Sequence, residues 1–466
     1  MLRPVNRLPP EILSHIAGYS FGEDAYDARS TIPLTHVCQY WRESIISAPE
    51  NWTLVSNERM KLAKLSLQRA KAAHLRVHLW MNLAHDSHDF LDTLIPHLEN
   101  TETLTASSIP NFEELANLFS KFPRSMPNLR SLTLQQDYFD GSDPSIDAFE
   151  WLPHTLEGLT LDDIYLSSSI LKLRALTDLT LRINEFVLPL DTLLDFLEGN
   201  RLLKRVELRI DFVEPPLRGS RRQSAFKNQL QLLRITCYDA VDGKALISNI
   251  ALSKGAQLEV DHYRYDETPI GAIDTLSGIS TTHLSNLHSP SSMEYHAGTA
   301  RQIRLLGLNG AASFSSCPCS SLPFEEFPRL HLTNIRRFHL NTEGWEPSRA
   351  GPRVFHHLSF FPTLETFTIE DETNLSRLLS PLLSNPSASP SLKTLGFLDC
   401  VIPEDFMEEL VRFASDRERT TSAWLHRILI VHRNGEFPSA GSIHKLRRIV
   451  KVVEIRMDDK LPKDLT

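Results

Sequence analysis

One short apolar phrase recurs along most of this 466-residue chain and limits what the chain can fold into. Its apolar residues are spaced at i, i+3 and i+5, as Leu129, Leu132 and Leu134 are in "NLRSLTL" at 128. Further copies are "TLEGLTL" at 155, "ALTDLTL" at 175, "LLKRVEL" at 202, "QLQLLRI" at 229, "RQIRLLGL" at 301, "NIRRFHL" at 334, "TLETFTI" at 363, "SLKTLGF" at 391, "WLHRILI" at 424 and "VVEIRM" at 452. Weaker copies begin near residue 72. The usual step is about 27 to 29 residues, which predicts an array of stacked repeats.

The segments between the phrases carry helical spacing. Leu91, Leu94, Ile95 and Leu98 fall at i, i+3, i+4 and i+7, which places four apolar side chains on one helical face. The same spacing recurs at Leu115, Leu118, Phe119 and Phe122, at Leu190, Leu193, Leu194 and Leu197, at Leu375, Leu378, Leu379 and Leu382, and at Met407, Leu410, Val411 and Ala414. Asn111 with Glu114 fits a capping box, and Asp191 fits an N-cap. Strand phrase and one-sided helix therefore alternate with one period.

A single strand–helix unit of this size cannot cover its own apolar face, so the units must stack into a curved α/β solenoid. The pattern resembles the leucine-rich repeat family, which implies a parallel sheet on the concave face and helices on the convex face. Asn184 and Cys400 occupy the family's Asn/Cys position, whereas Asp137, Asp211 and Glu372 replace it in other copies. We expect irregular repeats or an inserted loop at about 236–300, where the phrase weakens.

The amino-terminal segment "LPPEILSHI", Leu8 to Ile16, predicts a short helix that begins at its prolines. Ile12, Leu13 and Ile16 are expected on one side of it. A second helix is predicted to carry Leu34, Val37, Cys38 and Trp41 at helical spacing. About fifty residues cannot bury a full core alone. Their spare apolar surface must pack on the first repeats or be reserved for another protein.

The same residues resemble an F-box of the fungal type, through "LPPEIL" at 8–13 and "HVCQYWRESIISAPENW" at 36–52. The resemblance implies that this module docks on a Skp-type linker protein held by a cullin, while the repeats hold a protein substrate for ubiquitin transfer. By position it implies linker contacts at Leu8, Pro9, Ile12, Leu13, Ile16, Leu34, Val37, Cys38 and Trp41. The alternative is that these residues pack only within the module and against the first repeat.

The predicted organisation is therefore an all-α F-box module at 1–58, a helical linker at 59–71 and a leucine-rich-repeat-like solenoid at 72–466. Because strand residues alternate, those between the apolar positions face outward. The outward residues proposed to face a substrate are Arg182, Arg205, Glu207, Arg209, Arg234, Arg337, His339 and Glu370. Clustered arginines would suit an acidic or phosphorylated peptide. The alternative is a solvated surface of mixed charge, which Glu207 between two arginines favours.

Charge and composition argue against several classes of protein. A net charge of −9 argues against nucleic-acid or anionic-membrane binding, and the sequence has no apolar run of the roughly 18 residues that span a bilayer. The amino terminus has no secretory signal pattern. Five cysteines in so long a chain indicate reduced thiols in the cytoplasm or nucleus.

The sequence does not predict an enzyme, a metal site or a cofactor. Cys317 and Cys319 form a lone C-x-C, and His85, Asp86, His88 and Asp89 are explained by a polar turn with Asp89 near a helix cap. Glycine-rich phosphate loops and hydrolase motifs do not occur. The predicted function is a non-catalytic substrate adaptor of a Skp–cullin–F-box ubiquitin ligase. The alternatives are an F-box scaffold without a cullin, and a hydrolase or metal enzyme using His262, His283 and His288.

Overall fold

A computed structural model describes most of the chain. The described residues are 8–19, 29, 31–82, 84–123, 125–137, 149, 151–164, 166–167, 169–184, 188–210, 213–214, 224–225, 230–237, 245–247, 249–252, 256–262, 290–296, 301–307, 310–316, 334–342, 361–370, 375–385, 387, 389–420, 424–432 and 438–457. They form two compact units, one of residues 1–214 with 227–229 and one of residues 230–466 with 215–226.

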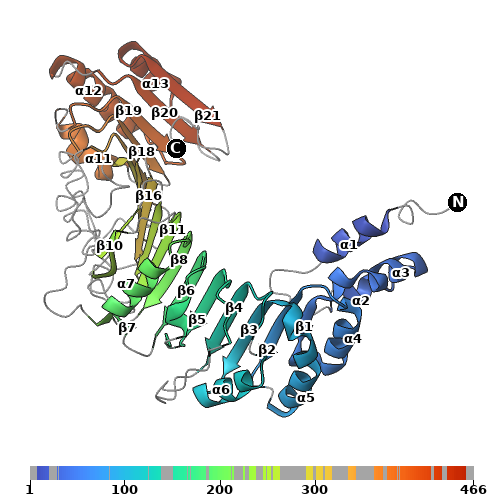
Figure 1. The fold of residues 1–466 in the computed structure, drawn as a ribbon. Helices are drawn as coiled ribbons and strands as arrows, with labels where there is room; N and C mark the ends of the chain where they lie inside the picture. The colour runs from blue at the N-terminus through green and yellow to red at the C-terminus, as the bar shows by residue number, and fades with distance from the viewer. Residues whose placement is uncertain are drawn as a thin grey trace. The chain divides into compact units, whose positions relative to one another are not determined.

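The first unit begins with short helices and continues as alternating strands and helices (Figure 1). Its α-helices are α1 Pro10–Tyr19, α2 Thr31–Leu34, α3 Gln39–Ser47, α4 Met60–Ala70, α5 Ala84–Leu94, α6 Phe112–Ser120 and α7 Leu190–Gly199. Its 3₁₀ helices are η3 Pro49–Trp52, η4 Asn57–Arg59, η5 Ile95–Asn100 and η6 Ile170–Lys172. Its strands are β1 Leu54–Ser56, β2 Leu75–Trp80, β3 Thr101–Ile109, β4 Ser131–Gln136, β5 Gly158–Asp162, β6 Asp178–Ile183, β7 Leu188–Pro189, β8 Arg205–Ile210 and β9 Val213–Glu214.

The main sheet of this unit is parallel and follows chain order, β1-β2-β3-β4-β5-β6-β8. Equivalent positions of successive phrases stand opposite one another, as Leu132, Leu159, Leu179 and Val206 do. All four side chains are buried. Their counterparts two residues on, such as Leu134 and Leu161, form a second buried row. The predicted parallel α/β repeat array is confirmed in this unit. The sheet face on the other side from these leucines is called the open face.

The amino-terminal helices join the sheet through β1, and a helix, α4, occupies the segment predicted as a helical linker. β1 follows η3 directly and pairs with β2 in parallel, with Val55 opposite Val77. The guanidinium of Arg69 on α4 lies 4.2 Å from the ring centroid of Trp52 on η3. Residues 54–56 are thus the first strand of the sheet, and the helix at 60–70 is its first covering helix.

The second unit has the same alternation with an irregular first part. Its strands are β10 Ser224–Ala225, β11 Leu232–Cys237, β12 Ile250–Ala251, β13 Gln257–His262, β14 Pro290–His296, β15 Arg301–Gly307, β16 Gly310–Ser316, β17 Arg337–Asn341, β18 Thr366–Glu370, β19 Thr394–Leu398, β20 Arg427–His432 and β21 Val452–Met457. Its helices are α11 Leu375–Ser384, α12 Glu404–Thr420 and α13 Ala440–Ile449.

The main sheet of the second unit runs β11-β13-β16-β15-β14-β17-β18-β19-β20-β21. All pairs are parallel except those of β15, which is antiparallel to both neighbours. The prediction that the copy at 301 continues a parallel array is therefore wrong. The connections on either side of β15 span residues 297–300 and 308–309, which is too short for a parallel crossover. The stretch at 236–300 also contains strands β13 and β14, which were not predicted because no clear copy of the apolar phrase occurs there.

The predicted repeat helices are present as α6, α7, α11 and α12. The helix expected to carry Leu91, Leu94, Ile95 and Leu98 is not continuous, because α5 ends at Leu94 and residues 95–100 form the 3₁₀ helix η5. Two further corrections concern helix starts. Asn111 Oδ1 accepts from the Glu114 amide at 2.8 Å, as an N-cap should. Asp191 is not an N-cap, because Pro189 holds that position and the helix begins at Leu190. The polar turn predicted around Asp89 is wrong as well, since α5 begins at Ala84 and continues past it.

The two family-type Asn/Cys positions make different ladder contacts. The Asn184 amide and Nδ2 donate to Asp163 Oδ1 and Oδ2 at 2.7 and 2.9 Å, and Asp163 has a positive φ of 54°. The buried thiol of Cys400 lies 3.5 Å from the Ile369 carbonyl oxygen on the neighbouring strand. The Cys400 thiol therefore covers a backbone carbonyl where the chain leaves its strand, whereas the Asn184 side chain pairs with the carboxylate of Asp163.

Several residues considered for chemistry lie outside the described part of the structure: Cys317, Cys319, His283, His288 and the side chains of His85, Asp86 and His88. Within the described part, Cys38, Cys237 and Cys400 form no disulfide, and no three His, Cys, Asp or Glu side chains gather as a metal site would require. The described helices are all too short or too polar to cross a membrane.

Replacing Gly396 by Ala is expected to destabilise the second unit. A Cβ at this position would stand 2.6 Å from Thr368 Cγ2 on the neighbouring strand, so the strands must shift. We expect a loss of about 1 to 3 kcal/mol in the free energy of unfolding, measured by urea titration. Adding Thr368→Ser should restore most of it, because serine lacks that methyl group. Gly158→Ala, whose Cβ would have its nearest contact with the Ser131 hydroxyl at 3.3 Å, is the matched control. An equal loss of stability in both alanine variants would show that the close contact with Thr368 is not the cause.

Candidate functional site

The amino-terminal module, residues 8–56, has a small closed core of its own. Leu13 and Ala17 of α1 are buried with Trp41 and Ile45 of α3 and with Trp52 of η3. Polar contacts fix these elements: Trp52 Nε1 donates to the Ile45 carbonyl at 3.0 Å. The Ser14 hydroxyl donates to Glu50 Oε1 at 2.8 Å. The elements around this core hold the rest of the module's surface in place.

The second predicted helix is broken, which corrects the expected arrangement of Leu34, Val37 and Cys38. α2 ends at Leu34, and Cys38 is the extended N-cap of α3, with φ −162° and ψ 172°. The Thr35 hydroxyl donates to the Ile32 carbonyl, and Arg42 Nε donates to the Thr35 carbonyl at 3.0 Å. These bonds close a turn over residues 35–38, so only Trp41 of the four lies in α3.

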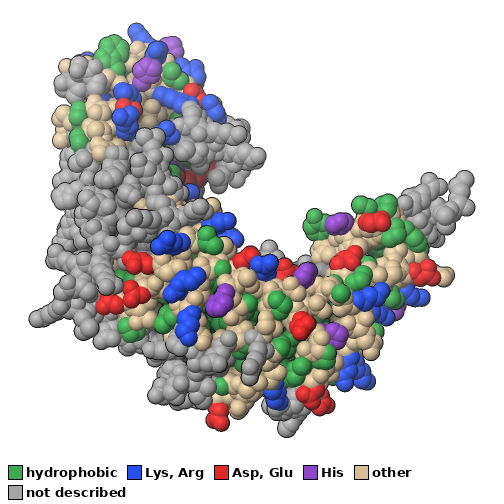
Figure 2. All heavy atoms as spheres, in the orientation of Figure 1, with side chains coloured by type: hydrophobic (Ala, Val, Ile, Leu, Met, Phe, Trp, Pro, Cys, Tyr) green, Lys and Arg blue, Asp and Glu red, His purple; other side chains and the backbone are tan. Residues whose placement is uncertain are grey.

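Large apolar side chains are left exposed on this module. Of the eight such side chains in the described residues, five belong to it: Ile12 (44% exposed), Ile16 (37%), Tyr19 (88%), Ile32 (37%) and Val37 (52%). Ile12, Ile16 and Tyr19 follow one another at i, i+4 and i+7 along α1, so they form one stripe, called the apolar stripe. Figure 2 shows apolar side chains gathered on this module beside carboxylates and a histidine. Exposed apolar patches of this kind are typical of surfaces that bind other proteins or membranes.

The residues proposed to contact a linker fall into two groups. Leu13 and Trp41 are buried in the core of the module. Pro9, Ile12, Ile16 and Val37 are exposed, and Leu8, Leu34 and Cys38 are partly exposed. Tyr19 and Ile32 were not predicted. Tyr19 stands three residues after Ile16 in α1, so helical spacing could have identified it.

Leu13→Ala and Ile12→Ala should differ in their effect on stability, because Leu13 lies in the core and Ile12 on the surface of the same helix. Leu13 is fully buried, and its truncation should cost about 2 to 5 kcal/mol in the free energy of unfolding. Truncation of the half-exposed Ile12 should lower the free energy of unfolding by about 1 kcal/mol or less. Tryptophan fluorescence of Trp41 and Trp52 during urea titration reports both. Equal costs would contradict the assigned faces of α1.

The open face of the first unit is largely uncharged along its middle. Thr105, Thr133, Thr160 and Thr180 stand opposite one another on β3, β4, β5 and β6. All four are half-buried. Such a row offers hydroxyl groups and methyl groups but no charge.

Arg182, Arg205 and Glu207, which are proposed to face a substrate in this unit, are paired within the chain. Arg182 lies 3.5 Å from Asp162 and 3.6 Å from Glu207, and Arg205 Nε lies 2.5 Å from Asp178. Burial raises the pKa of Asp162, and Arg182 opposes that rise. Arg209 stands opposite Arg182 on the next strand. Figure 2 shows acidic and basic side chains interspersed on this unit. The pairing favours the mixed-charge alternative over a phosphopeptide reader, whose arginines would have to be available for phosphate.

A buried histidine lies at the start of the same face. His78 Nε2 is 2.8 Å from Ser107 Oγ, and the Ser107 hydroxyl donates to Gln135 Oε1 at 3.1 Å. Because serine has a single hydroxyl hydrogen, Nε2 must donate to Ser107. The ring stacks on Trp80 with centroids 4.5 Å apart. Burial lowers the pKa of His78 to about 4.

His78 should make the first unit sensitive to acid. The pKa is depressed in the folded state, so the unfolded state takes up the proton first. The free energy of unfolding should fall as pH drops from 6.5 to about 4, by at most about 3 kcal/mol. Urea titrations across this range should show a shallower decline in His78→Gln. Parallel curves for the variant and the parent protein would contradict the prediction.

The second unit shows the same neutralisation on its open face. Arg234 pairs with Glu259 at 2.5 Å, and Arg304 pairs with Glu294 at 3.3 Å. Near the carboxyl terminus, Arg427 pairs with Glu454 at 3.0 Å. Arg337 is exposed at the start of β17. Exposed pairs of this kind contribute only about 0–1 kcal/mol each to stability.

His339 and Glu370 belong to a buried polar group on β17 and β18. His339 Nδ1 is 2.8 Å from Thr368 Oγ1, and Nε2 is 3.2 Å from Glu370 Oε2. Asn341 Nδ2 also donates to Glu370 Oε2 at 3.0 Å. The order hydroxyl, imidazole, carboxylate matches that of a hydrolytic triad. Thr368 is only 3% exposed, however, so a substrate carbonyl cannot reach its oxygen. This group holds two strands together.

Comparison with known proteins adds little to this geometry. No family model and no curated protein matches the sequence. Among solved structures, the complex of Rad7 and Elc1 from yeast shares 14% identity with a TM-score of 0.32, covering 84% of this chain and 87% of that one. A Bacteroides fragilis protein shares 14% identity with a TM-score of 0.22, covering 78% of this chain and 76% of that one. TM-scores this low carry no argument, so the fold rests on the strands and helices described above.

Proposed function

We propose that this protein is a non-catalytic substrate adaptor of a Skp–cullin–F-box type ubiquitin ligase. The amino-terminal module would dock on a Skp-type linker protein held by a cullin. The open faces of the repeats would hold a protein substrate. The chemistry of ubiquitin transfer would belong to other subunits, and the adaptor would act by raising the local concentration of substrate.

The observation that carries this proposal is the apolar stripe. The module already has a closed core in Leu13, Trp41 and Trp52, so Ile12, Ile16 and Tyr19 are not needed to complete it. Exposed apolar side chains at helical spacing suit a groove-and-helix interface with another protein. The resemblance of residues 8–13 and 36–52 to an F-box identifies a Skp-type linker as the candidate partner.

The open faces support a role in holding a protein rather than a small anion. Arg182, Arg205 and Arg234 are paired within the chain, and the threonine row of the first unit is neutral. A partner recognised there would be chosen by shape and hydrogen bonding, since compensated charges attract neither sign strongly. The cytoplasm and nucleus are the compartments proposed for such a complex.

Ile12→Asp/Ile16→Asp should abolish binding to a purified Skp-type linker protein. Two carboxylates would have to be buried without partners at the centre of the interface. We expect an affinity loss of about 100-fold or more, measured by isothermal titration calorimetry. Fluorescence of Trp41 and Trp52 should remain native, since neither substituted residue is in the core.

Leu202→Asp/Val401→Asp is the matched control. Both side chains are large, apolar and more than half exposed, but they lie outside the amino-terminal module. This variant should bind the linker as the parent protein does. Unchanged binding by the Ile12→Asp/Ile16→Asp variant would refute the docking surface.

The rival function, an F-box scaffold without a cullin, differs in one assembly step. The purified protein with the linker should recruit a cullin into a ternary complex on size-exclusion chromatography if the adaptor proposal is correct. A stable complex with the linker that does not take up a cullin would favour the scaffold.

A further inference from the structure

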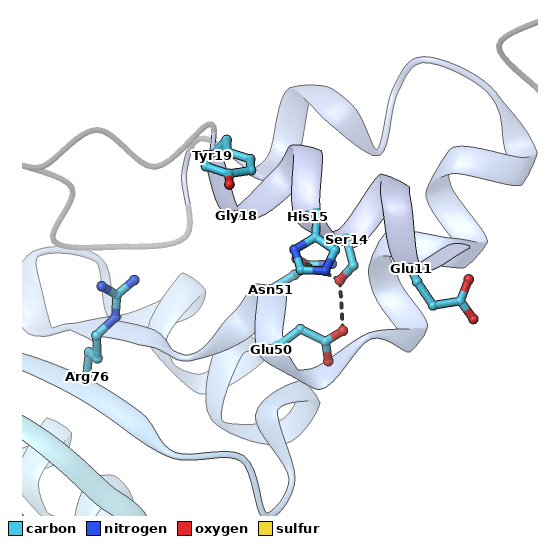
Figure 3. Close-up of a pocket in the computed structure, with 8 residues that line it drawn as sticks. All are labelled: Glu11, Ser14, His15, Gly18, Tyr19, Glu50, Asn51 and Arg76. Carbon is cyan, nitrogen blue, oxygen red and sulfur yellow. Dashed lines mark hydrogen bonds between the residues drawn. The ribbon is translucent and has the colours of Figure 1, made fainter. Parts of the chain in front are cut away.

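A cavity of about 580 Å³ lies beside the apolar stripe, between the amino-terminal module and the first strands of the sheet (Figure 3). Its lining residues are Glu11, Ser14, His15, Gly18, Tyr19, Glu50, Asn51 and Arg76. Three elements contribute them: α1, η3 and β2. Tyr19 belongs both to the cavity and to the apolar stripe, so the two are continuous.

The floor of the cavity is rigid. The side chains of Ser14 and Asn51 are more than nine-tenths buried. Ser14 donates to Glu50 Oε1 at 2.8 Å and lies 3.2 Å from Asn51 Oδ1. Asn51 Nδ2 donates to the Ile45 carbonyl at 3.4 Å. The carboxylate of Glu50 is therefore held in place through Ser14, while its second oxygen can still accept a hydrogen bond.

The cavity has an excess of negative charge near α1. Glu11 and Glu50 line it there, and among the described residues neither carboxylate has an ion pair. Arg76 is the cavity's one guanidinium and stands on β2. In Figure 3 it lies at the opposite end from Glu11, with Glu50 and His15 between them.

We propose that this cavity receives a basic side chain, arginine or lysine, of the linker protein that covers the apolar stripe. This inference rests on the proposed function. Carboxylates accept charge-assisted hydrogen bonds from a guanidinium, and the exposed ring of Tyr19 offers a face for a cation. Apolar contact at Ile12 and Ile16 would supply affinity, and the charge pairing at the edge would fix orientation.

The test compares Glu11→Gln/Glu50→Gln with the parent protein for binding to a purified Skp-type linker protein at low and high salt. Glutamine at position 50 keeps an acceptor for Ser14, so the module should stay folded. We expect about a 3- to 10-fold loss of affinity at low salt, as for two partly exposed ion pairs. The loss should shrink at high salt because screening weakens the parent's pairs.

Two further variants locate the effect. Glu102→Gln/Glu113→Gln removes the same charge from exposed positions of the repeats and should leave affinity unchanged. Arg76→Gln should leave affinity unchanged or raise it, because it removes a positive charge from the cavity lining. A loss with Arg76→Gln as large as that of the double glutamine variant would overturn the inference.

The outcomes separate this inference from the proposed function. If the parent protein does not bind the linker, both fail. If the parent binds and Glu11→Gln/Glu50→Gln binds equally well with the same salt dependence, the cavity inference fails and the adaptor proposal stands. A salt-dependent loss confined to the cavity variant supports both.

Discussion

Cross-strand stacking of apolar side chains at equivalent repeat positions is the interaction on which both units depend. Leu132, Leu159, Leu179 and Val206 illustrate it, because parallel pairing places each directly against the next. Adjacent strands lie about 4.8 Å apart, so each side chain is covered by its neighbours as well as by the helices. A repeat removed from the row would leave apolar surface on both sides uncovered. Stability is therefore shared between neighbours rather than held within any one repeat.

The strands and helices of the repeats were predictable because their patterns are local. Alternation with period two and spacing of 3.6 residues depend only on neighbouring side chains, so every clear copy of the phrase forms a strand. Strand direction was not predictable in this way. The copy at 301 has the same alternation whether it runs parallel or antiparallel, and the short connections around β15 decide it.

The amino-terminal module shows where periodicity stops being informative. Ile12 and Leu13 are adjacent and equally apolar, yet Leu13 is sealed in the core and Ile12 faces solvent. Which of them turns inward depends on contacts with Trp41 and Trp52, far along the chain. The turn at residues 35–38 likewise depends on Arg42, whose guanidinium holds the Thr35 carbonyl. The pairing of Arg182 with Asp162 and Glu207 joins three strands and could not be read from one of them.

The junction of β1 with β2 has a mechanical consequence. Because Leu54–Ser56 hydrogen-bonds into the sheet and Arg69 stacks on Trp52, no free joint separates the amino-terminal helices from the first repeats. A protein seated on those helices would be held at a set angle to the strands that follow. The distance from such a protein to the first repeats would then be set by the backbone of the first unit.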